Sequence, residues 1–545
     1  MRPRSLWVVG VAALLLVGDI SAGTPKPSAT RDAQALAEKI DRHIAERWTE
    51  ARTEPAPVAG DAEFLRRVYL DLAGRIPSVE EARTFLNDRR SDKRSRLIEQ
   101  LLGGSRYVAH FTNVWRALLL PEAGNNFQVR LQQASFEAWV KKQVARNAGY
   151  DRMARDLLTT PIANQGPLAL FGGEGEPTAL AFYSAKEFKP ENLAASTARV
   201  FLGISVECAQ CHNHPFAEWK REQFWGFAAF YAGIKSKRTM DLLLPEREIT
   251  DKRELMIPGT ERVAQATFLD GSEPVWKSKT SSRATLADWM TAPANPYFAR
   301  AGVNRLWFYF FGTGLIDPVD EMVGGERRAS HPELLDLLAR EFAAHQFDVK
   351  FLIRAITQSR TYQLTSAGTH KSQDDRTLFA KMPLRGLTAE QLFDSVAMAT
   401  GFRDSGGGDD LISAIFGGQR SARSEFLTGF ANQSERATES QTSILQSLSL
   451  MNGKVIADAT SLQRSETLAA VAEAPFATTP ERIETLYLAT LSRKPEAKEL
   501  DRAVKFVQTA VGRGKGGADE KRAYNEALAD VFWALLNSPE FNLNH

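Results

Sequence analysis

Residues 64–81, with the sequence FLRRVYLDLAGRIPSVEE, contain two successive helix signals and give the clearest indication of the fold class. A first helix is expected over Phe64–Leu72. Pro77 then precedes Ser78 and Glu81, whose S-x-x-E spacing is typical of a capping box at the start of a helix. The stretch therefore predicts a helix, a short connection and a second helix.

Helical periodicity continues on both sides of this stretch. An apolar residue recurs at every fourth position of an earlier segment, at Leu36, Ile40, Ile44 and Trp48. Further helices are expected over residues 93–103, 134–146 and 190–203. Within the first stretch, Arg66 and Arg67 are expected to form a buried, structural ion pair with Asp71.

Residues 236–281 have a different pattern. Leu242–Leu244 and Glu261–Phe268 have the composition of short strands, and Asp270–Gly271 has that of a hairpin turn. The sequence therefore predicts a mainly α fold, with two helical domains joined by a small β-containing insert. The expected segments are a signal peptide at 1–22, an N-terminal helical domain at 30–235, the insert at 236–281 and a C-terminal helical domain at 282–545.

The first 22 residues have the pattern of a secretory signal peptide. Arg2 and Arg4 are basic, residues 6–17 form an apolar run, and the small residues Ser21 and Ala22 follow. The run is shorter than the roughly 20 apolar residues that a membrane-spanning helix needs. We expect export to the periplasm or cell surface and no membrane span after signal removal. A signal that stays attached as an anchor is the alternative.

The composition is that of an ordinary globular protein. A chain of 545 residues is long enough for two or more domains with cores of their own. The formal net charge of +2 is close to neutral, so it gives no basis for binding nucleic acid or an anionic membrane surface.

The two cysteines of the chain lie in one pentapeptide, Cys208–His212, of sequence CAQCH. C-x-x-C-H is the spacing at which c-type haem is attached. Cys208 and Cys211 lie about one helical turn apart, so their thiols reach the two vinyl groups of one porphyrin edge, and His212 is the expected iron ligand. Export agrees with this prediction, because haem c is attached outside the cytoplasm.

Other chemistries fit the same residues. Cys208, Cys211 and His214 supply three ligands for zinc or another soft metal, which prefers four. A structural disulfide between the cysteines is a further alternative, because neighbouring thiols oxidise in exported proteins. A thiol–disulfide exchanger is disfavoured, because its C-x-x-C normally follows a strand, whereas a helix is expected before this one.

The surroundings of the motif have two interpretations. A group of aromatic residues follows it, and these residues either wall a porphyrin or pack in the core at helical spacing. They are Phe216, Trp219, Phe224, Trp225, Phe227, Phe230 and Tyr231. Met322 and His331 are candidates for a sixth iron ligand. His331 also falls within Ser330–Glu333, where a second capping box with a proline near the first helical position is expected.

Three carboxylates, Asp317, Asp320 and Glu321, lie within five residues, and Arg305 precedes them. They are candidates for calcium binding or for an acid–base pair in a hydrolase. The alternative is that they are turn and cap residues. The serine-hydrolase motif G-x-S-x-G and the zinc-protease motif H-E-x-x-H are absent from the sequence.

Several of these motifs resemble a two-domain family of secreted proteins that is common in planctomycetes and related bacteria. The matching segments of the first half are Arg66–Leu72 and Val206–Phe216. Those of the second half include Asn304–Trp307, Asp317–Asp320, Ser330–Leu334 and Leu536–Phe541. The family joins a PSCyt-two domain to a PSD-one domain, both of unknown function, and is associated with cytochromes.

The resemblance implies the domain layout and export, and it implies no particular catalytic activity. Many relatives carry a separate N-terminal cytochrome c domain, and none is expected here. The chain also departs from the family before Ser330, where residues 324–328 read GGERR in place of an Asn-containing loop.

The leading hypothesis is an exported, mainly helical protein with one haem c on Cys208, Cys211 and His212, which exchanges electrons with an extracytoplasmic redox partner. One alternative is a structural or binding protein with a Cys/His metal or disulfide staple, linked by resemblance to secreted carbohydrate-processing systems. A second alternative is a carboxylate-dependent hydrolase. In these alternatives zinc, or no cofactor, replaces haem.

Overall fold

The protein is described by a computed structural model over residues 27–124, 126–162, 176–213, 219–239, 242–245, 247–323, 329–403, 421–430, 454–512 and 516–545. The fold is mainly helical, as predicted, and the strands of these segments form three two-stranded sheets. No helix in the described part of the chain is long and apolar enough to cross a bilayer. The predicted signal peptide at 1–22 and the departing loop at 324–328 lie outside the described residues.

In the first part of the chain, the elements that the structure describes are helices. They are α1 (Pro27–Ala51), α2 (Asp61–Ala73), α3 (Val79–Asn87), α4 (Lys93–Gly103), α5 (Ser105–Leu119), the turn η1 (Pro121–Gly124), α6 (Phe127–Ala145), α7 (Tyr150–Leu158), α9 (Leu180–Ala185) and α10 (Pro190–Thr197). The apolar face predicted on α1 is buried at all four positions. The capping box of α3 is confirmed, because the Ser78 hydroxyl accepts the Glu81 N–H at 3.1 Å and the Glu81 carboxylate accepts the Ser78 N–H at 2.7 Å.

Short elements follow, and they include both hairpins of the insert. They are η2 (Ala198–Leu202), η3 (Glu207–Gln210), α11 (Arg221–Ala228), η4 (Ala229–Tyr231), β1 (Ser236–Thr239), β2 (Leu242–Pro245), β3 (Glu254–Met256) and β4 (Val263–Gln265). Strands therefore lie within residues 236–281, as predicted. The turn predicted at Asp270–Gly271 is also present, because the Gly271 N–H donates to the Phe268 carbonyl oxygen at 2.9 Å, but both hairpins lie before it in the chain. Gly259, whose φ of +73° lies in the region that favours glycine, is in the connection between β3 and β4.

Helices again form most of the remaining chain. They are α12 (Ser282–Met290), α13 (Phe298–Phe311), α14 (Pro332–Ala344), α15 (Val349–Gln358), the turns η5 (Lys371–Asp374) and η6 (Arg376–Leu378), α16 (Ala389–Thr400), α18 (Ala422–Phe430), α20 (Lys454–Ala459), α21 (Glu466–Glu473), α22 (Thr479–Leu491), α23 (Ala497–Val511), α24 (Ala518–Leu536) and α25 (Pro539–Asn542). Strands β5 (Arg385–Gly386) and β6 (Leu543–Asn544) pair antiparallel.

The second predicted capping box is wrong. His331 is the N-cap of α14, and its side chain makes no capping hydrogen bond. The Ser330 hydroxyl donates instead to the Leu315 carbonyl oxygen at 3.2 Å, so it does not reach the helix start. Pro332 does occupy the first turn, as predicted.

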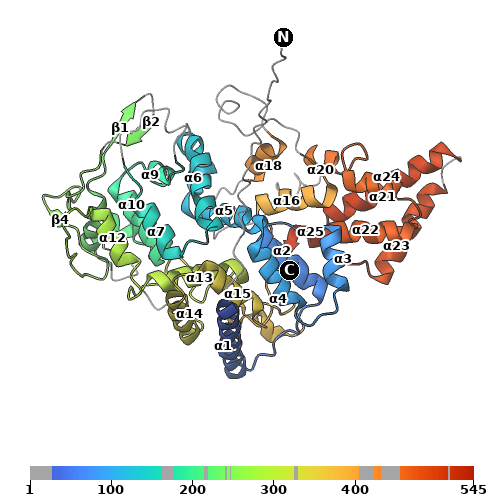
Figure 1. The fold of residues 1–545 in the computed structure, drawn as a ribbon, viewed down its shortest axis with the longest axis horizontal. Coiled ribbons are helices and arrows are strands. Elements are labelled where there is room, and N and C mark those ends of the chain that lie inside the picture. The colour runs from blue at the N-terminus through green and yellow to red at the C-terminus, as the bar shows by residue number, and fades with distance from the viewer. Residues whose placement is uncertain are drawn as a thin grey trace, which may run out of the picture.

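The buried apolar side chains of the described segments form two hydrophobic cores. The larger core runs from α1 to residue 382 and includes Leu488, so it crosses the predicted boundary at residue 281. The smaller core joins Leu70 and Ile76 to α16 and the helices from α20 onward. The hairpins lie at one end of the molecule and α20–α24 at the other, with α2–α5, α13–α16 and α25 between them (Figure 1). The division into domains stays a prediction.

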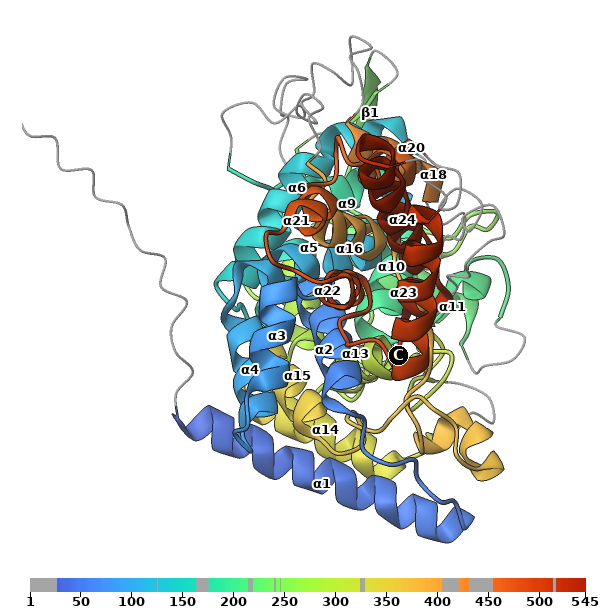
Figure 2. The same cartoon turned by 90° about the vertical axis from the view of Figure 1, so that its right-hand side faces the viewer.

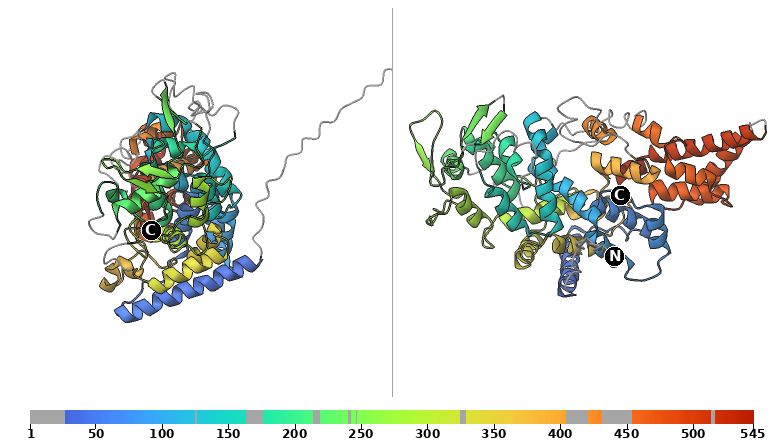
Figure 3. Two further views of the ribbon diagram at one scale, coloured as in Figure 1. Left: turned by 90° about the vertical axis from the view of Figure 1, so that its left-hand side faces the viewer. Right: turned by 45° about the horizontal axis from the view of Figure 1, so that its top comes forward.

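Helix α1 lies along one side of the molecule, where it packs against α15 and α14 (Figure 2). Helix α2 packs against α3 and α4, and α3 in turn packs against α22, so the blue N-terminal segment lies beside the red C-terminal helices (Figure 3). The chain therefore brings its first hundred residues against its last hundred.

Arg66, Arg67 and Asp71 of α2 are buried as predicted, but neither arginine forms an ion pair with Asp71. Arg67 forms an ion pair with Glu63 at 2.7 Å. Asp71 instead pairs with Arg385, which lies far along the chain. Arg66 donates to backbone carbonyl oxygens near the C-terminus, including that of Phe541 at 2.6 Å. The three side chains therefore connect α2 to distant segments.

Candidate functional site

The cysteine motif follows a helix, as predicted. Helix α10 continues into the π-helical turn η2, and Gly203 ends it with a φ of +65°. The short 3-10 helix η3 then carries Cys208, and Cys211 follows directly after it. Side chains three residues apart lie above one another on a 3-10 helix. Both thiols are unpaired and exposed, so one surface turn presents them together.

His212 completes this turn with a fixed imidazole. Its Nδ1 lies 2.7 Å from the carbonyl oxygen of Asn213. A carbonyl oxygen only accepts hydrogen bonds, so Nδ1 carries the proton and the lone pair of the neutral ring lies on Nε2. The side chain is exposed. The Nε2 atom is therefore the one that is suited to bind a metal.

Helix α11 is hydrogen-bonded to the motif and to the residue after it. The Trp225 indole N–H donates to the Gln210 carbonyl oxygen at 3.1 Å, and the Arg221 Nε donates to the same oxygen at 3.4 Å. The Arg221 backbone N–H donates to the Asn213 side-chain oxygen at 3.0 Å. The Arg221 guanidinium also reaches the Pro258 carbonyl oxygen, which ties α11 to the β3–β4 hairpin.

The aromatic residues after the motif belong to the core. The described members of the group, Trp219, Phe224, Trp225, Phe227, Phe230 and Tyr231, are each no more than 8% exposed and pack in the larger core. Core packing is therefore confirmed for these six residues. Phe216, and the predicted zinc ligand His214, lie outside the described residues.

The structure brings two predicted sites together. The Met322 N–H donates to the Gly203 carbonyl oxygen at 2.8 Å, just before the cysteine motif. The Arg199 guanidinium lies 3.8 Å from Glu207, which precedes Cys208, and 3.6 Å from Asp320. The motif and the predicted carboxylate cluster are therefore neighbours, although about a hundred residues separate them in the sequence.

The other candidate for a sixth ligand packs elsewhere. The His331 ring lies in the larger core region at 5.5 Å from the Phe379 ring, and its Nδ1 lies 3.0 Å from the Ser330 hydroxyl. Burial lowers the pKa of His331 to about 4. The imidazole is neutral at physiological pH and packs beside Phe379.

The carboxylate cluster consists of turn and ion-pair residues. Asp320 is 4% exposed, and Arg305 contacts one of its oxygens at 2.6 Å while Arg199 contacts the other. Asp317 is exposed and precedes a cis-proline. Among the described residues, no three His, Cys, Asp or Glu side chains are grouped to hold a metal ion. The arrangement favours the turn-and-cap alternative over an acid–base pair.

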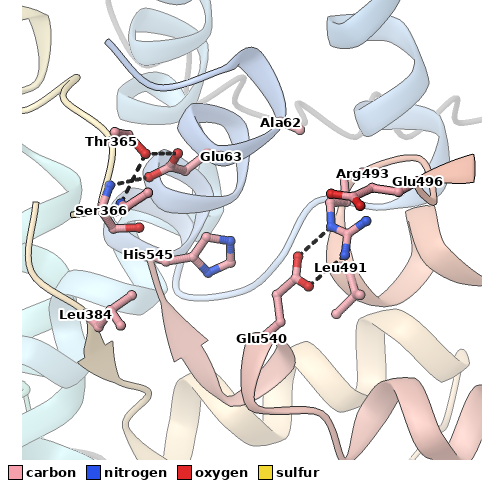
Figure 4. A pocket seen from close by; sticks show the side chains of 11 residues that line it. Ala62, Glu63, Thr365, Ser366, Leu384, Leu491, Arg493, Glu496, Glu540 and His545 are labelled. Carbon is pink, nitrogen blue, oxygen red and sulfur yellow. Dashed lines mark hydrogen bonds and ion pairs between the residues drawn. The ribbon is translucent and has the colours of Figure 1, made fainter. Parts of the chain in front are cut away.

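A cleft that the sequence does not reveal lies where α2 meets the C-terminus (Figure 4). It has a volume of about 520 Å³, and its lining includes Glu63, Ser366, Arg493, Glu540 and His545. Glu63 accepts the Ser366 N–H at 2.7 Å, and Arg493 contacts Glu540 at 2.6 Å. Burial lowers the pKa of His545. The charges of Arg493 and Glu540 thus compensate each other within the wall, whereas Glu63 pairs with Arg67 and also accepts the Thr365 hydroxyl at 2.8 Å.

No sequence motif indicated this cleft, because its lining comes from five separate segments. The closest indication in the sequence was the group of charged residues Arg66, Arg67 and Asp71 on α2. The neighbouring Arg67 supports the cleft by donating to the His545 carbonyl oxygen at 3.1 Å.

Two family models match the chain in order. Residues 39–236 match PSCyt2, a protein of unknown function (DUF1549), and residues 282–415 match PSD1, a protein of unknown function (DUF1553). The cysteine motif lies within the first match, and the Asp317–Glu321 segment lies within the second. No curated protein and no solved structure matches the chain.

Proposed function

The chain belongs to the family that joins a PSCyt2 domain to a PSD1 domain, and within this family of unassigned function we propose that it is an exported c-type haem protein that acts in extracytoplasmic redox chemistry. The observation that carries the proposal is the exposed turn that presents Cys208, Cys211 and His212 together.

The geometry of these residues fits the attachment of haem. Cys208 and Cys211 are three residues apart at one 3-10 turn, a spacing that suits attachment to the same porphyrin edge. His212 directs the lone pair of its imidazole to Nε2, because Nδ1 is bound to a backbone carbonyl oxygen. When bound, haem supplies a one-electron redox centre. The chain itself holds the porphyrin edge and orients the iron ligand.

The neighbouring aromatic residues are buried in the core, so we expect a haem attached at the motif to be exposed to solvent. Phe224, Phe227 and Tyr231 fill the core, so they do not form a wall above the motif. A haem edge that reaches solvent favours electron exchange with another protein over conversion of a substrate in a closed pocket. This supports electron transfer as the role of the site.

Zinc is the competing ligand for the same thiols. Zinc needs a third and a fourth ligand near Cys208 and Cys211, and His214, the predicted third ligand, lies outside the described residues. Haem attachment needs only the two thiols and His212, and all three lie in the described part of the chain. The haem proposal therefore rests on described residues alone.

The test is expression with the signal peptide in a host that exports the chain and attaches haem. We expect the reduced protein to show the absorption bands of a c-type haem, and the colour to stay with the chain after denaturation. A Cys208→Ala/Cys211→Ala double variant is the matched control and should be colourless. A colourless wild-type protein would overturn the proposal. Zinc in elemental analysis of that protein would support a metal staple instead.

A further inference from the structure

Asn213 connects the motif to helix α11 through both its backbone and its side chain. Its carbonyl oxygen accepts a hydrogen bond from His212 Nδ1 at 2.7 Å. Its side-chain Oδ1 accepts the backbone N–H of Arg221 at 3.0 Å. One residue therefore joins the imidazole of the proposed iron ligand to a helix.

The Arg221 N–H is one of the donors that a helix leaves unsatisfied at its start. Arg221 is the first residue of α11, and no side-chain capping bond comes from Lys220, the residue before it. The Asn213 amide oxygen supplies an acceptor from outside the helix. The bond thus satisfies a helix end and fixes Asn213 at the same time.

The helix to which Asn213 is bound is itself firmly held. Phe224 and Phe227 of α11 are buried in the larger core. Trp225 donates to the Gln210 carbonyl oxygen within the motif. The position of the Asn213 carbonyl oxygen is therefore set by packed structure, although the motif itself lies on the surface.

We propose that Asn213 is a positioning residue for His212, which keeps the Nδ1–H of the imidazole bound to a carbonyl oxygen and its Nε2 directed at the iron. The inference rests on the proposed function. A hydrogen bond at Nδ1 fixes the tautomer and the ring orientation of a metal-binding histidine and raises its basicity. Removal of the Asn213 side chain releases the backbone from α11, so the carbonyl oxygen no longer holds the ring.

The experiment compares Asn213→Ala with Asn213→Asp in the haem-loaded chain. Asp keeps an oxygen acceptor for the Arg221 N–H, whereas Ala has none. We expect Asn213→Ala to raise the reduction potential and to weaken the bond between His212 and iron by about 10- to 100-fold, as second-shell substitutions do. Asn213→Asp should stay close to the wild type in both measurements.

Arg221→Ala is the matched control, because it removes the side-chain bonds to Gln210 and Pro258 but keeps the backbone N–H that Asn213 binds. It should leave the reduction potential near the wild-type value. An unchanged potential in Asn213→Ala, or an Asn213→Asp variant that behaves like Asn213→Ala, would overturn the inference while leaving the haem proposal intact.

Nitrogen NMR of His212 in the haem-free chain distinguishes failure of the haem proposal from failure of the inference about Asn213. It reports directly which ring nitrogen is protonated. If the wild-type chain attaches no haem, the proposed function fails. In that case, loss of the Nδ1–H tautomer in Asn213→Ala still supports positioning by Asn213, and an unchanged tautomer overturns it.

Discussion

Met322 donates its backbone N–H to the carbonyl oxygen of Gly203 across 2.8 Å, and its thioether lies close over that glycine. Gly203 ends the helical segment that leads into the cysteine motif. The second half of the chain therefore supports the turn on which the proposed haem site is built. The ion pairs from Arg199 to Glu207 and to Asp320 add a second connection between the same regions.

Replacement of Gly203 by Ala should destabilise this junction. Gly203 has a φ of +65°, and an added Cβ would lie 2.6 Å from the Met322 sulfur. A left-handed residue with a side chain costs about 1–2 kcal/mol. We expect the free energy of unfolding in a denaturant titration to fall by about that amount. In the Gly203→Ala/Met322→Ala double variant the contact is relieved but the backbone strain remains. Wild-type stability in Gly203→Ala would contradict this description.

Replacement of Asp71 by Ala should lower the free energy of unfolding more than Gly203→Ala does. The Asp71 carboxylate accepts hydrogen bonds from Arg385 at 2.8 and 3.0 Å, from the Tyr362 hydroxyl at 2.7 Å and from Asn544 at 2.7 Å. Its loss leaves the Arg385 guanidinium without its carboxylate, and breaking a buried pair costs about 3–5 kcal/mol. The measurement is chemical denaturation of the whole chain.

The control for Asp71 is the exposed carboxylate of Asp374, which pairs with Lys381 at 2.9 Å. Asp374→Ala should leave the stability unchanged within error, because exposed pairs contribute little. Equal stability of the two variants would show that the contacts of Asp71 do not hold α2 to the C-terminal segments.

The stability of the protein should decrease as the pH falls through the range from 6.5 to 4. Burial lowers the pKa of His110 to about 4, and its Nε2 lies 2.6 Å from the Tyr309 hydroxyl. Between its folded pKa and the ordinary value of about 6.5, the unfolded chain binds a proton that the folded chain does not. Burial lowers the pKa of His331 as well, so its protonation also destabilises the folded chain as the pH falls.

Each such histidine lowers the free energy of unfolding by about 1.4 kcal/mol per pH unit at most, and the loss is complete below pH 4. Denaturant titrations at pH 7, 6 and 5 measure the slope. A His110→Gln variant should have a shallower slope than the wild type. Identical slopes would show that His110 is not held neutral by burial.

The local structure was largely predictable from the sequence. The four-residue spacing on α1 predicted its buried face, and the S-x-x-E spacing predicted the start of α3. The helix expected at residues 93–103 corresponds to α4. These features depend on neighbouring residues, whose periodicity and capping chemistry are visible in the sequence.

The contacts between distant segments were not predictable. Asp71 pairs with Arg385 rather than with its neighbours on α2, because the fold brings the charge of another segment to its oxygens. Likewise, Met322 was considered as a sixth iron ligand, but no pattern indicated that the carboxylate of Asp320 lies beside the cysteine motif. Ser330 had the correct spacing for a capping box, but its hydroxyl donates a hydrogen bond to the Leu315 carbonyl oxygen instead. Single-sequence patterns do not report which distant acceptor competes for a donor.

Substitution of the carboxylates tests the hydrolase alternative. Asp320→Asn removes the charge that Arg305 and Arg199 face in a buried position, so we expect a loss of about 3 kcal/mol in the free energy of unfolding. Asp317 is exposed, and Asp317→Asn should leave the stability unchanged. If Asp320→Asn is as stable as Asp317→Asn, Asp320 is not held as a structural ion-pair residue and the acid–base alternative gains support.

The most direct test of the central claim is peptide mass spectrometry of the mature chain, purified from a host that exports it and attaches haem. We predict one haem per chain, covalently bound to the peptide that contains Cys208 and Cys211, and absent when both are replaced by Ala. An unmodified peptide, or one in which the two cysteines form a disulfide, would contradict the assignment of the exposed turn as a haem site.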